Sequence, residues 1–563
     1  MKLTLIYAIL LGVFCTYNNA IGQVKYNLDF EFGEKTKTGL TETSFGVVAK
    51  NDNFIYVLSG KGKGVGLALP GGFGPVVGIG TKVKLELQIF DHDLNIKKEL
   101  SLEDIALGAL NGAPDKTYEF IYQDKQEKIW LFFSTHSKSA NHLYRMRLND
   151  NNSGFEKPIL VSRQSGDKDH NRQGTYNYKL SPNKELLCIY SYNSVKKAKS
   201  TDVYVEVMDR NFKRQWIILN KIPQYNKDGY LSTLASSLDK ATNIKSENIK
   251  LTNEGSFYFL SKVKEKKEKL EKYVLYAFSN GKRNAITKVF SNTKYYNNAL
   301  YLQPYNGKVG VVGYYSDVTS KSKDIKGIMI EMMDPITLKT LNSIHTPFTN
   351  KQRKDFMVSD AYPKSAEKAG KFVGKDEKLN KQFAKGKDVF ISGRTKPLRL
   401  FFHSNNSFTL ASEMYNEQTY VTTSTDPNTG MTSTSSNFKM YYGDVCFVNF
   451  DDKGKVNWIK NYHKYQVLDR NTILCKGMFM EQFDDTILFF YANMNVDKIQ
   501  FAEVDFNGNI HSRDVQPLKN GRIDKYYFVP ESYVKLGENT YLGNNLKSFK
   551  SKLTKLVITE NTL

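Results

Sequence analysis

Residues 300–344 read LYLQPYNGKVGVVGYYSDVTSKSKDIKGIMIEMMDPITLKTLNSI and contain two pairs of short apolar or alternating runs. The first pair is separated by Asn306 and Gly307, and the second pair by Asp334 and Pro335. Turn residues of this kind between runs rich in Val, Ile and Tyr are typical of β-hairpins. The stretch therefore predicts four consecutive antiparallel strands, joined by two tight turns and one longer loop.

The same order of strands recurs along the chain. Hairpins of the first kind occur eight times, with turns near Asp52, Lys125, Asn183, Glu254, Asn306, Asn405, Asp484 and Glu538. A second hairpin follows each of the first seven, within residues 85–102, 143–161, 203–219, 273–290, 328–344, 445–462 and 500–515. Four-stranded units repeated in this way are the sequence signature of β-propeller blades.

Two expected strands fall outside this series. VKYNLDFEF, residues 24–32, precedes the first hairpin, and SKLTKLVIT, residues 551–559, follows the eighth with no partner strand behind it. Pairing the two would complete the last blade from both chain ends and remove the exposed edges of an open ring. We therefore predict an all-β fold, a β-propeller of eight four-stranded blades closed by its terminal strands. Seven blades are the main alternative, and a string of β-sandwich domains would not be expected to keep one strand order throughout.

The N-terminus, MKLTLIYAILLGVFCTYNNAIGQ, has the layout of a secretory signal peptide over residues 1–22. Its apolar run from Leu3 to Phe14 is shorter than the roughly 20 residues that span a bilayer. We expect cleavage before Gln23, a single propeller domain over residues 23–563, and export to the periplasm, the outer surface or the surroundings of a bacterium. No later segment is apolar for long enough to cross a membrane as a helix.

The formal net charge of +22 is concentrated on one side of the predicted ring. Turns within hairpins lie on one face of a propeller, here called the turn face. Loops that join second to third strands, or one blade to the next, lie on the opposite loop face, and these loops carry nearly the whole positive charge. A field of one sign attracts polyanions. The anion-binding candidates on the loop face are Lys196, Lys197, Lys199, Lys262, Lys264, Lys266, Lys267, Lys269, Lys321, Lys323, Lys371, Lys378 and Lys381.

The largest basic segment is an insertion after the fifth blade, residues 349–392, with 11 basic and 6 acidic residues. Its sequence lacks the alternation of strands, so we predict short helices that could form a lid over the mouth of the central channel. A second elaboration, residues 415–442, is rich in Thr and contains a DPNTG turn. It predicts a long hairpin that projects from the loop face and could dock a protein partner.

No motif predicts a cofactor. The glycine-rich stretch at residues 60–82 lacks the Lys-Ser/Thr end of a P-loop and the spacing of a dinucleotide fingerprint, so it is interpreted as a long connection. Asp167, Asp169 and Asn171 have the spacing that opens a calcium loop, but no Glu follows at its twelfth position. Asp91, Asp93 and Asn95 repeat this spacing and are interpreted as a hairpin turn.

Catalytic residues cannot be assigned from the sequence. Secreted propellers can hydrolyse glycans with two carboxylates in the channel. The candidates on or beside innermost strands are Glu119, Glu247, Glu481 and Glu531. We expect a binding or scaffold protein of the cell envelope or extracellular space rather than an enzyme. Its expected ligand is an anionic polysaccharide, an envelope surface or a protein partner; nucleic acid is not favoured, and a glycan hydrolase or lyase is the alternative.

Overall fold

The structure is a computed structural model. It describes residues 25–37, 42–62, 83–106, 116–136, 140–165, 176–194, 200–223, 248–263, 272–282, 284–291, 294–318, 324–360, 371–387, 389–425, 432–468, 477–492, 499–515, 527–547 and 550–560. The predicted signal peptide and most of the glycine-rich stretch lie outside these residues. Within them, no helix is long and apolar enough to cross a membrane.

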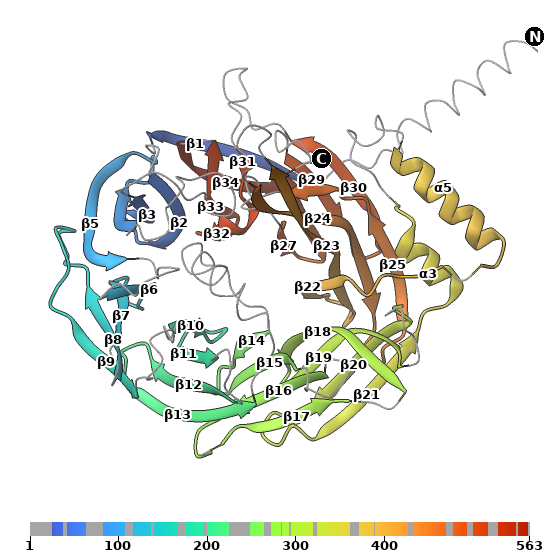
Figure 1. The fold of residues 1–563 in the computed structure, drawn as a ribbon, viewed down its shortest axis with the longest axis horizontal. Helices are drawn as coiled ribbons and strands as arrows, with labels where there is room; N and C mark the ends of the chain where they lie inside the picture. The colour runs from blue at the N-terminus through green and yellow to red at the C-terminus, as the bar shows by residue number, and fades with distance from the viewer. Residues whose placement is uncertain are drawn as a thin grey trace, which may run out of the picture.

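Eight four-stranded blades are arranged in a ring (Figure 1). The first blade consists of β2 (Glu42–Lys50), β3 (Ile55–Gly62), β4 (Val83–Phe90) and β5 (Ile96–Ala106). The second consists of β6 (Lys116–Gln123), β7 (Ile129–His136), β8 (Ala140–Arg147) and β9 (Ile159–Ser165). The third consists of β10 (Tyr176–Leu180), β11 (Leu186–Ser194), β12 (Ser200–Asp209) and β13 (Arg214–Pro223). The fourth consists of β14 (Ile249–Leu251), β15 (Phe257–Val263), β16 (Lys272–Phe278) and β17 (Ile286–Phe290).

The other four blades follow the same order. The fifth consists of β18 (Tyr295–Tyr305), β19 (Lys308–Asp317), β20 (Gly327–Met333) and β21 (Thr340–Pro347). The sixth consists of β22 (Thr395–Phe402), β23 (Phe408–Thr425), β24 (Thr432–Phe450) and β25 (Val456–Tyr462), with β26 (Gln466–Leu468) beside β24. The seventh consists of β27 (Phe479–Phe483), β28 (Thr486–Ala492), β29 (Ile499–Val504) and β30 (Ile510–Val515). The eighth contains β31 (Tyr527–Phe528), a short 3₁₀ helix at Pro530–Ser532, β32 (Val534–Lys535), β33 (Thr540–Lys547) and β34 (Lys550–Glu560).

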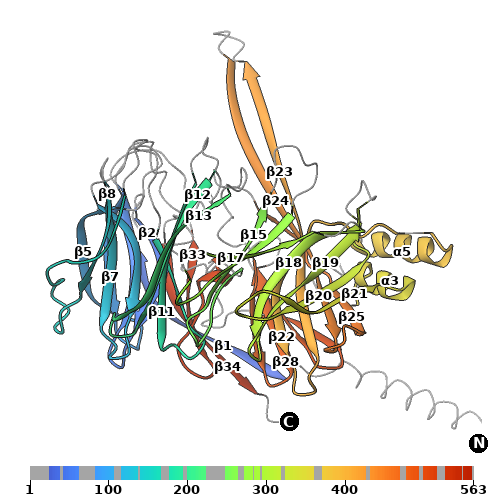
Figure 2. The same ribbon diagram turned by 90° about the horizontal axis from the view of Figure 1, so that it is seen from below.

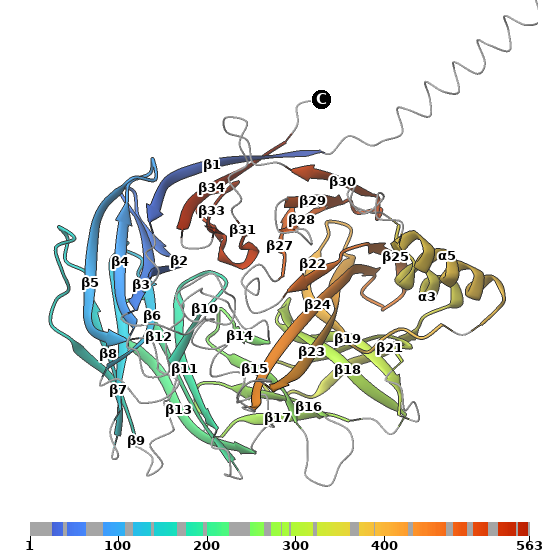
Figure 3. The same cartoon turned by 45° about the horizontal axis from the view of Figure 1, so that its top comes forward.

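The eighth blade is completed by the N-terminal strand. β1 (Tyr26–Lys37) pairs antiparallel with β34, from Tyr26 opposite Glu560 to Lys37 opposite Lys550. It lies along the outer side of β34 (Figure 3). Both the eight-blade count and the closure by the two chain ends are therefore confirmed. The pairing ties residues more than 500 positions apart, and it covers an edge that an open ring would expose.

Several turns between third and fourth strands are closed by an aspartate that accepts backbone N–H groups of the same turn. In the third blade, the carboxylate of Asp209 accepts the backbone N–H groups of Asn211 and Lys213, both at 2.9 Å. Asp334, Asp451 and Asp505 accept backbone N–H groups in the same way. The calcium-like spacing that begins at Asp91 is such a turn, which confirms its interpretation as a hairpin.

These turns also lock each blade against the one before it. Leu94, Phe212 and Leu338 occupy equivalent turn positions with positive φ. Phe212 packs on the rings of the second blade, with its centroid 5.0 Å from that of Trp130. In the sixth blade the equivalent turn residue is Gly454. The Cγ2 atom of Ile344, from the fifth blade, lies 2.7 Å from the position that a Cβ of residue 454 would occupy. The turn at Phe212 therefore inserts a side chain into the preceding blade, and the turn at Gly454 leaves room for one.

A buried carboxylate of the seventh blade holds the start of the closing strand. The Glu503 side chain accepts the backbone N–H groups of Lys25 at 2.7 Å and Tyr26 at 2.6 Å. Burial raises the pKa of Glu503 from its usual value of 4.5 to about 6. The folded protein therefore binds this proton more tightly than the unfolded chain does, so the contribution of Glu503 to stability falls as the pH rises through this interval.

We expect Glu503→Gln to remove this part of the pH dependence. The difference in free energy of unfolding, variant minus wild type, should be larger at pH 7.5 than at pH 4, because only the wild type must hold a buried charge at the higher pH. Urea unfolding of both proteins at the two pH values measures it. An unchanged difference would contradict the assignment of a raised pKa to Glu503.

Candidate functional site

Only part of the predicted anion-binding set falls on described residues. The candidates outside them are Lys196, Lys197, Lys199, Lys264, Lys266, Lys267, Lys269, Lys321 and Lys323. Lys262 is a residue of β15 and Lys371 begins a helix of the insertion, but their side chains are not described. Lys378 and Lys381 lie on that helix and are exposed. The part of the candidate site that the structure describes therefore consists of the insertion and the neighbouring sixth blade.

The described residues of the insertion include two helices, α3 (Asn350–Met357) and α5 (Lys371–Ala384). Thr349 caps α3, because its hydroxyl accepts the N–H of Gln352, and the Gln352 side chain accepts the N–H of Thr349 in return. Phe356 is fully buried and stacks edge-on against Tyr314 of β19, with ring centroids 5.6 Å apart. The predicted helical character of the insertion is confirmed, and α3 is packed into the propeller core.

Arg353 fixes α3 to the segment before β20 and to the end of the insertion. Its guanidinium is buried and donates to the Asp324 carboxylate at 3.1 and 3.2 Å, and to the backbone carbonyls of Ile325 and Val389. Asp324 also accepts the N–H of Ile391 at 2.7 Å. A buried guanidinium with several acceptors gives a charge-assisted network that holds one geometry.

The helices lie outside the ring, beside β25, and do not cover the channel (Figures 1 and 2). Asn461, near the end of β25, donates its amide to the carbonyl of Phe356 at 2.6 Å, and its N–H to the Asp360 carboxylate at 2.9 Å. The prediction of a lid over the channel mouth is wrong. The buried side of α3 packs against β25, the outer strand of the sixth blade. Sequence periodicity alone could not identify this strand as the surface against which the helix packs.

Lysines of both helices face the solvent. Lys351 and Lys354 on α3 and Lys378 and Lys381 on α5 are exposed, as is Lys385, whose N–H still bonds to the carbonyl of Lys381. Within the described part of the chain, none of these five side chains forms an ion pair. Lys378 and Lys381 lie on the same side of α5, and Lys385 directly follows its last residue. The exposed lysines therefore form a row of positive charges on an insertion that is packed against the sixth blade.

The predicted long hairpin is present and rises from the sixth blade (Figure 2). β23 and β24 stay paired from Phe408 opposite Phe450 to Thr425 opposite Thr432. The part beyond Tyr415 and Tyr442, here called the arm, extends past the neighbouring blades on the loop face. The elaborated features of the structure, the helices and the arm, therefore belong to one sector of the ring.

A buried ion pair lies at the base of the arm. Lys464 follows β25, its side chain is fully buried, and it donates to the carboxylate of Glu413 on β23. The ammonium also lies over the rings of Tyr442, at 5.5 Å from the centroid, and Tyr491, at 5.0 Å. Its contact with the carbonyl of Gly477, at 3.4 Å, joins the sixth blade to the seventh. These contacts anchor the arm.

A second buried pair is next to the first. The Nδ1 atom of His463 is 2.8 Å from a carboxylate oxygen of Asp444 on β24, and both side chains are almost completely buried. Sequence reasoning missed both pairs. Glu413 and Lys464 are separated by 51 positions, and in sequence they resemble the exposed charges found throughout the chain. Only the pairing of β23, β24 and β25 shows that they meet.

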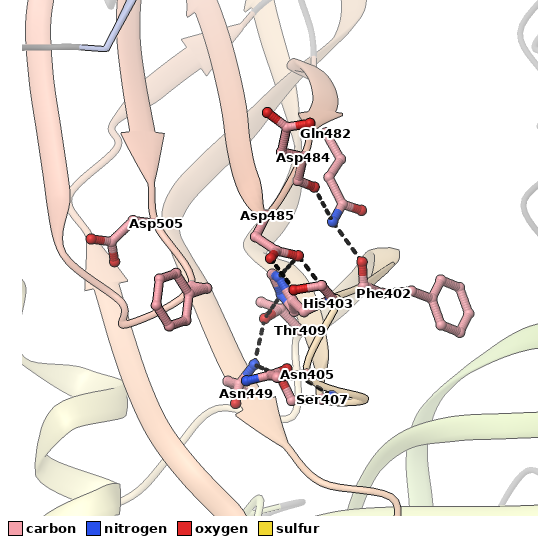
Figure 4. Close-up of polar contacts among 12 residues, drawn as sticks. Phe402, His403, Asn405, Ser407, Thr409, Asn449, Gln482, Asp484, Asp485 and Asp505 are labelled. Atoms are coloured by element: carbon pink, nitrogen blue, oxygen red, sulfur yellow. Dashed lines mark hydrogen bonds and ion pairs between the residues drawn. The ribbon is translucent and has the colours of Figure 1, made fainter.

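The turn face contains a hydroxyl, an imidazole and a carboxylate in line between the sixth and seventh blades (Figure 4). The Nε2 atom of His403 is 2.7 Å from the Thr409 hydroxyl, and its Nδ1 is 3.7 Å from the Asp485 carboxylate. Burial lowers the pKa of His403. Asn449 donates to the Thr409 hydroxyl at 3.0 Å. The order of the three groups resembles a catalytic relay. Because the imidazole and the hydroxyl are both buried, a substrate cannot contact them in this structure.

The carboxylates predicted for the channel do not form a pair in the described residues. Glu119 is fully buried, accepts the Ser134 hydroxyl at 2.5 Å and the N–H of Tyr176 at 2.9 Å, and links the second blade to the third. Glu481 lies 3.7 Å from Arg399. Glu247 is outside the described residues, and the side chain of Glu531 is not described. The structure thus gives Glu119 a role between blades.

The described residues contain no site for a metal ion and no reactive thiol. Asp167, Asp169 and Asn171, the calcium candidate, are outside the described residues, and within them no group of three or more His, Cys, Asp or Glu side chains is arranged to hold a metal ion. Cys188 and Cys446 are buried free thiols, and burial raises the pKa of each. Such thiols are unreactive members of the core.

The strand pairing itself defines the protein as a β-propeller. No protein-family model matches the chain, and no curated protein sequence matches it. Solved structures that align with it include the polysaccharide lyase Uly1, at 8% identity over 94% of this chain and 99% of that one, with a TM-score of 0.37. The Dos1 propeller aligns at 10% identity over 91% and 94%, with a TM-score of 0.33. An apocarotenoid oxygenase of Synechocystis aligns at 8% identity over 90% and 95%, also with a TM-score of 0.33. Likeness at these levels supports no statement about function.

Proposed function

We propose that the protein is an exported binding propeller that attaches to an anionic polysaccharide or envelope surface through its basic surface, of which the structure describes the exposed lysines of the insertion outside the ring. The observation that carries the proposal is the row of exposed lysines on α3 and α5, which have no ion-pair partner within the described residues. Ammonium groups without carboxylate partners are available to a polyanion, and several of them act together on the same ligand.

The contacts that fix α3 to the propeller favour binding of a polyanion to these lysines. Arg353 and Phe356 hold α3 in the propeller core, and Asp360 holds the following turn against Asn461. A charged surface that is already fixed loses less conformational entropy when its ligand binds. The alternative of a glycan-active enzyme would need two paired carboxylates, and the described candidates Glu119 and Glu481 do not form such a pair.

We expect the triple substitution of Lys378, Lys381 and Lys385 by Glu to weaken retention on an immobilised anionic polysaccharide by about tenfold or more near physiological ionic strength, because three attractive charges become repulsive. The measurement is the dissociation constant of the protein from Gln23 onward, across a salt series, on anionic and neutral polysaccharides. Wild-type binding should be limited to the anionic ligand and should weaken as salt is added.

The matched control reverses three exposed lysines of the turn face, Lys213, Lys308 and Lys453, and changes the net charge by the same amount. We expect this control to bind much more nearly like the wild type. Equal loss in both variants would mean that total charge, and not the α5 surface, determines binding. Absence of wild-type retention on every anionic ligand at physiological salt would overturn the proposed function.

A further inference from the structure

One edge of the arm has no partner strand among the described residues. β22 pairs with β23 only as far as Thr395 opposite Met414, and one more bond joins the N–H of Tyr415 to the carbonyl of Arg394. From Glu417 to Thr425, β23 pairs on one side with β24, and no described strand lies on its other side. An edge strand of this length presents a row of backbone N–H and C=O groups that can form a ladder with another chain.

Beyond Glu417, this edge lacks the charged side chains that usually prevent an edge strand from pairing with another chain. Proteins blunt their edge strands with charged side chains, proline or a covering element. Outer strands of the blades follow this rule: seven of the eight, all except β21, contain at least one Lys, Arg, Asp or Glu. In contrast, Asp426 is the only charged residue between Gln418 and Phe438. From Gln418 to Thr425 the arm is therefore an uncharged strand edge in a chain of which 25% of the residues are charged.

We propose that β23 of the arm pairs with β23 of a second copy of this chain, to form a four-stranded antiparallel sheet across a twofold axis. An antiparallel pair of identical strands is self-complementary, because each residue that meets a second residue is met by it in return. The uncharged edge contains nothing that selects a partner of opposite charge, whereas a second copy supplies an edge of the same length and the same hydrogen-bonding pattern.

The length of the arm allows this contact despite the charge of the protein. Two bodies with a formal charge of +22 each repel one another. Nine strand residues from Glu417 to Thr425 extend about 30 Å at ~3.3 Å per residue, whereas charges are screened over about 8 Å at physiological ionic strength. Pairing along the arms therefore keeps the two bodies several screening lengths apart. A pairing edge on the blades themselves would not have this advantage.

The test is the molar mass of the protein from Gln23 onward, measured by analytical ultracentrifugation over a concentration series. We expect a concentration-dependent dimer. In a first variant, Asn-Gly replaces residues 418–439 and joins Glu417 to Met440, which are already strand partners. In a second variant, Val421→Lys and Thr423→Lys place charges on the proposed pairing strand. Both variants should be monomeric, and their unfolding transitions should show that the propeller is intact.

The matched control places the same two charges on the other strand of the arm, through Ser433→Lys and Ser435→Lys. Two copies that pair through β23 would separate the β24 strands by three strand spacings, about 14 Å, so we expect this control to dimerise almost as well as the wild type. A monomeric wild type over the whole series would overturn the proposal. So would a dimer that persists without the arm, or equal loss of dimer in both lysine variants.

Discussion

Replacing Lys464 with Met should lower the free energy of unfolding by about 3–5 kcal/mol, because the carboxylate of Glu413 would be left buried without its counter-charge. The Lys464 side chain is fully buried and that of Glu413 is 4% exposed, so water cannot replace the lost partner without opening the base of the arm. The two tyrosine rings that surround the ammonium would also lose their cation–π contacts. Chemical unfolding monitored by tryptophan fluorescence measures the loss.

The double variant Lys464→Met with Glu413→Leu tests the cause. It should be clearly more stable than Lys464→Met alone, because no buried charge is left. Lys455→Met, at an exposed lysine in the turn of the same blade, should change stability by no more than about 0.5 kcal/mol. A loss below about 1 kcal/mol for Lys464→Met would show that the ammonium is not required to neutralise Glu413.

Arg353→Ala should be comparably destabilising, by about 3 kcal/mol or more, and should also disturb the proposed ligand surface. The substitution leaves the carbonyls of Ile325 and Val389 without this donor, and it removes the bidentate contact to Asp324. Because α3 would lose its attachment, its lysines would no longer be held in place. We expect lower stability together with weaker retention on an anionic polysaccharide.

Lys354→Ala is the matched control for this prediction. It removes a neighbouring positive charge from the same helix, but its side chain is exposed and forms no ion pair among the described residues. Stability should be almost unchanged, and retention should fall only slightly. Limited proteolysis of the insertion separates the two effects: Arg353→Ala should be cut faster than the wild type, whereas Lys354→Ala should not. Equal cleavage of all three proteins would contradict the anchoring role of Arg353.

Local patterns were sufficient to predict the architecture. Asn306-Gly307 and Asp334 mark turns because of their own backbone and side-chain chemistry, and the neighbouring runs of Val, Ile and Tyr fit a half-buried strand wherever they occur. The same argument holds for the arm, where two Thr-rich runs flank DPNTG. Closure by β1 and β34 followed from counting strands, since one blade needed a fourth strand and one terminal strand had no blade.

The candidate site was only partly predictable. Lys378 and Lys381 were identified from charge and are exposed as expected. The position of their helix outside the ring was not, because a basic segment between two blades can fold over the channel or against the rim. Glu119 was placed among the channel carboxylates, although the structure buries it between blades. Its immediate neighbours in sequence do not reveal that Ser134 and the N–H of Tyr176 surround it.

The sequence by itself therefore determined the fold class, the eight-fold repeat and the way the ring closes. The first two properties depend on contacts between residues close in the chain, and the closure followed from the count of strands. Tertiary structure alone decided where the insertion docks, that Lys464 meets Glu413, and which carboxylates are buried. These outcomes depend on side chains that are distant in sequence and brought together by strand pairing, and a buried charge is stable only where such a partner is supplied.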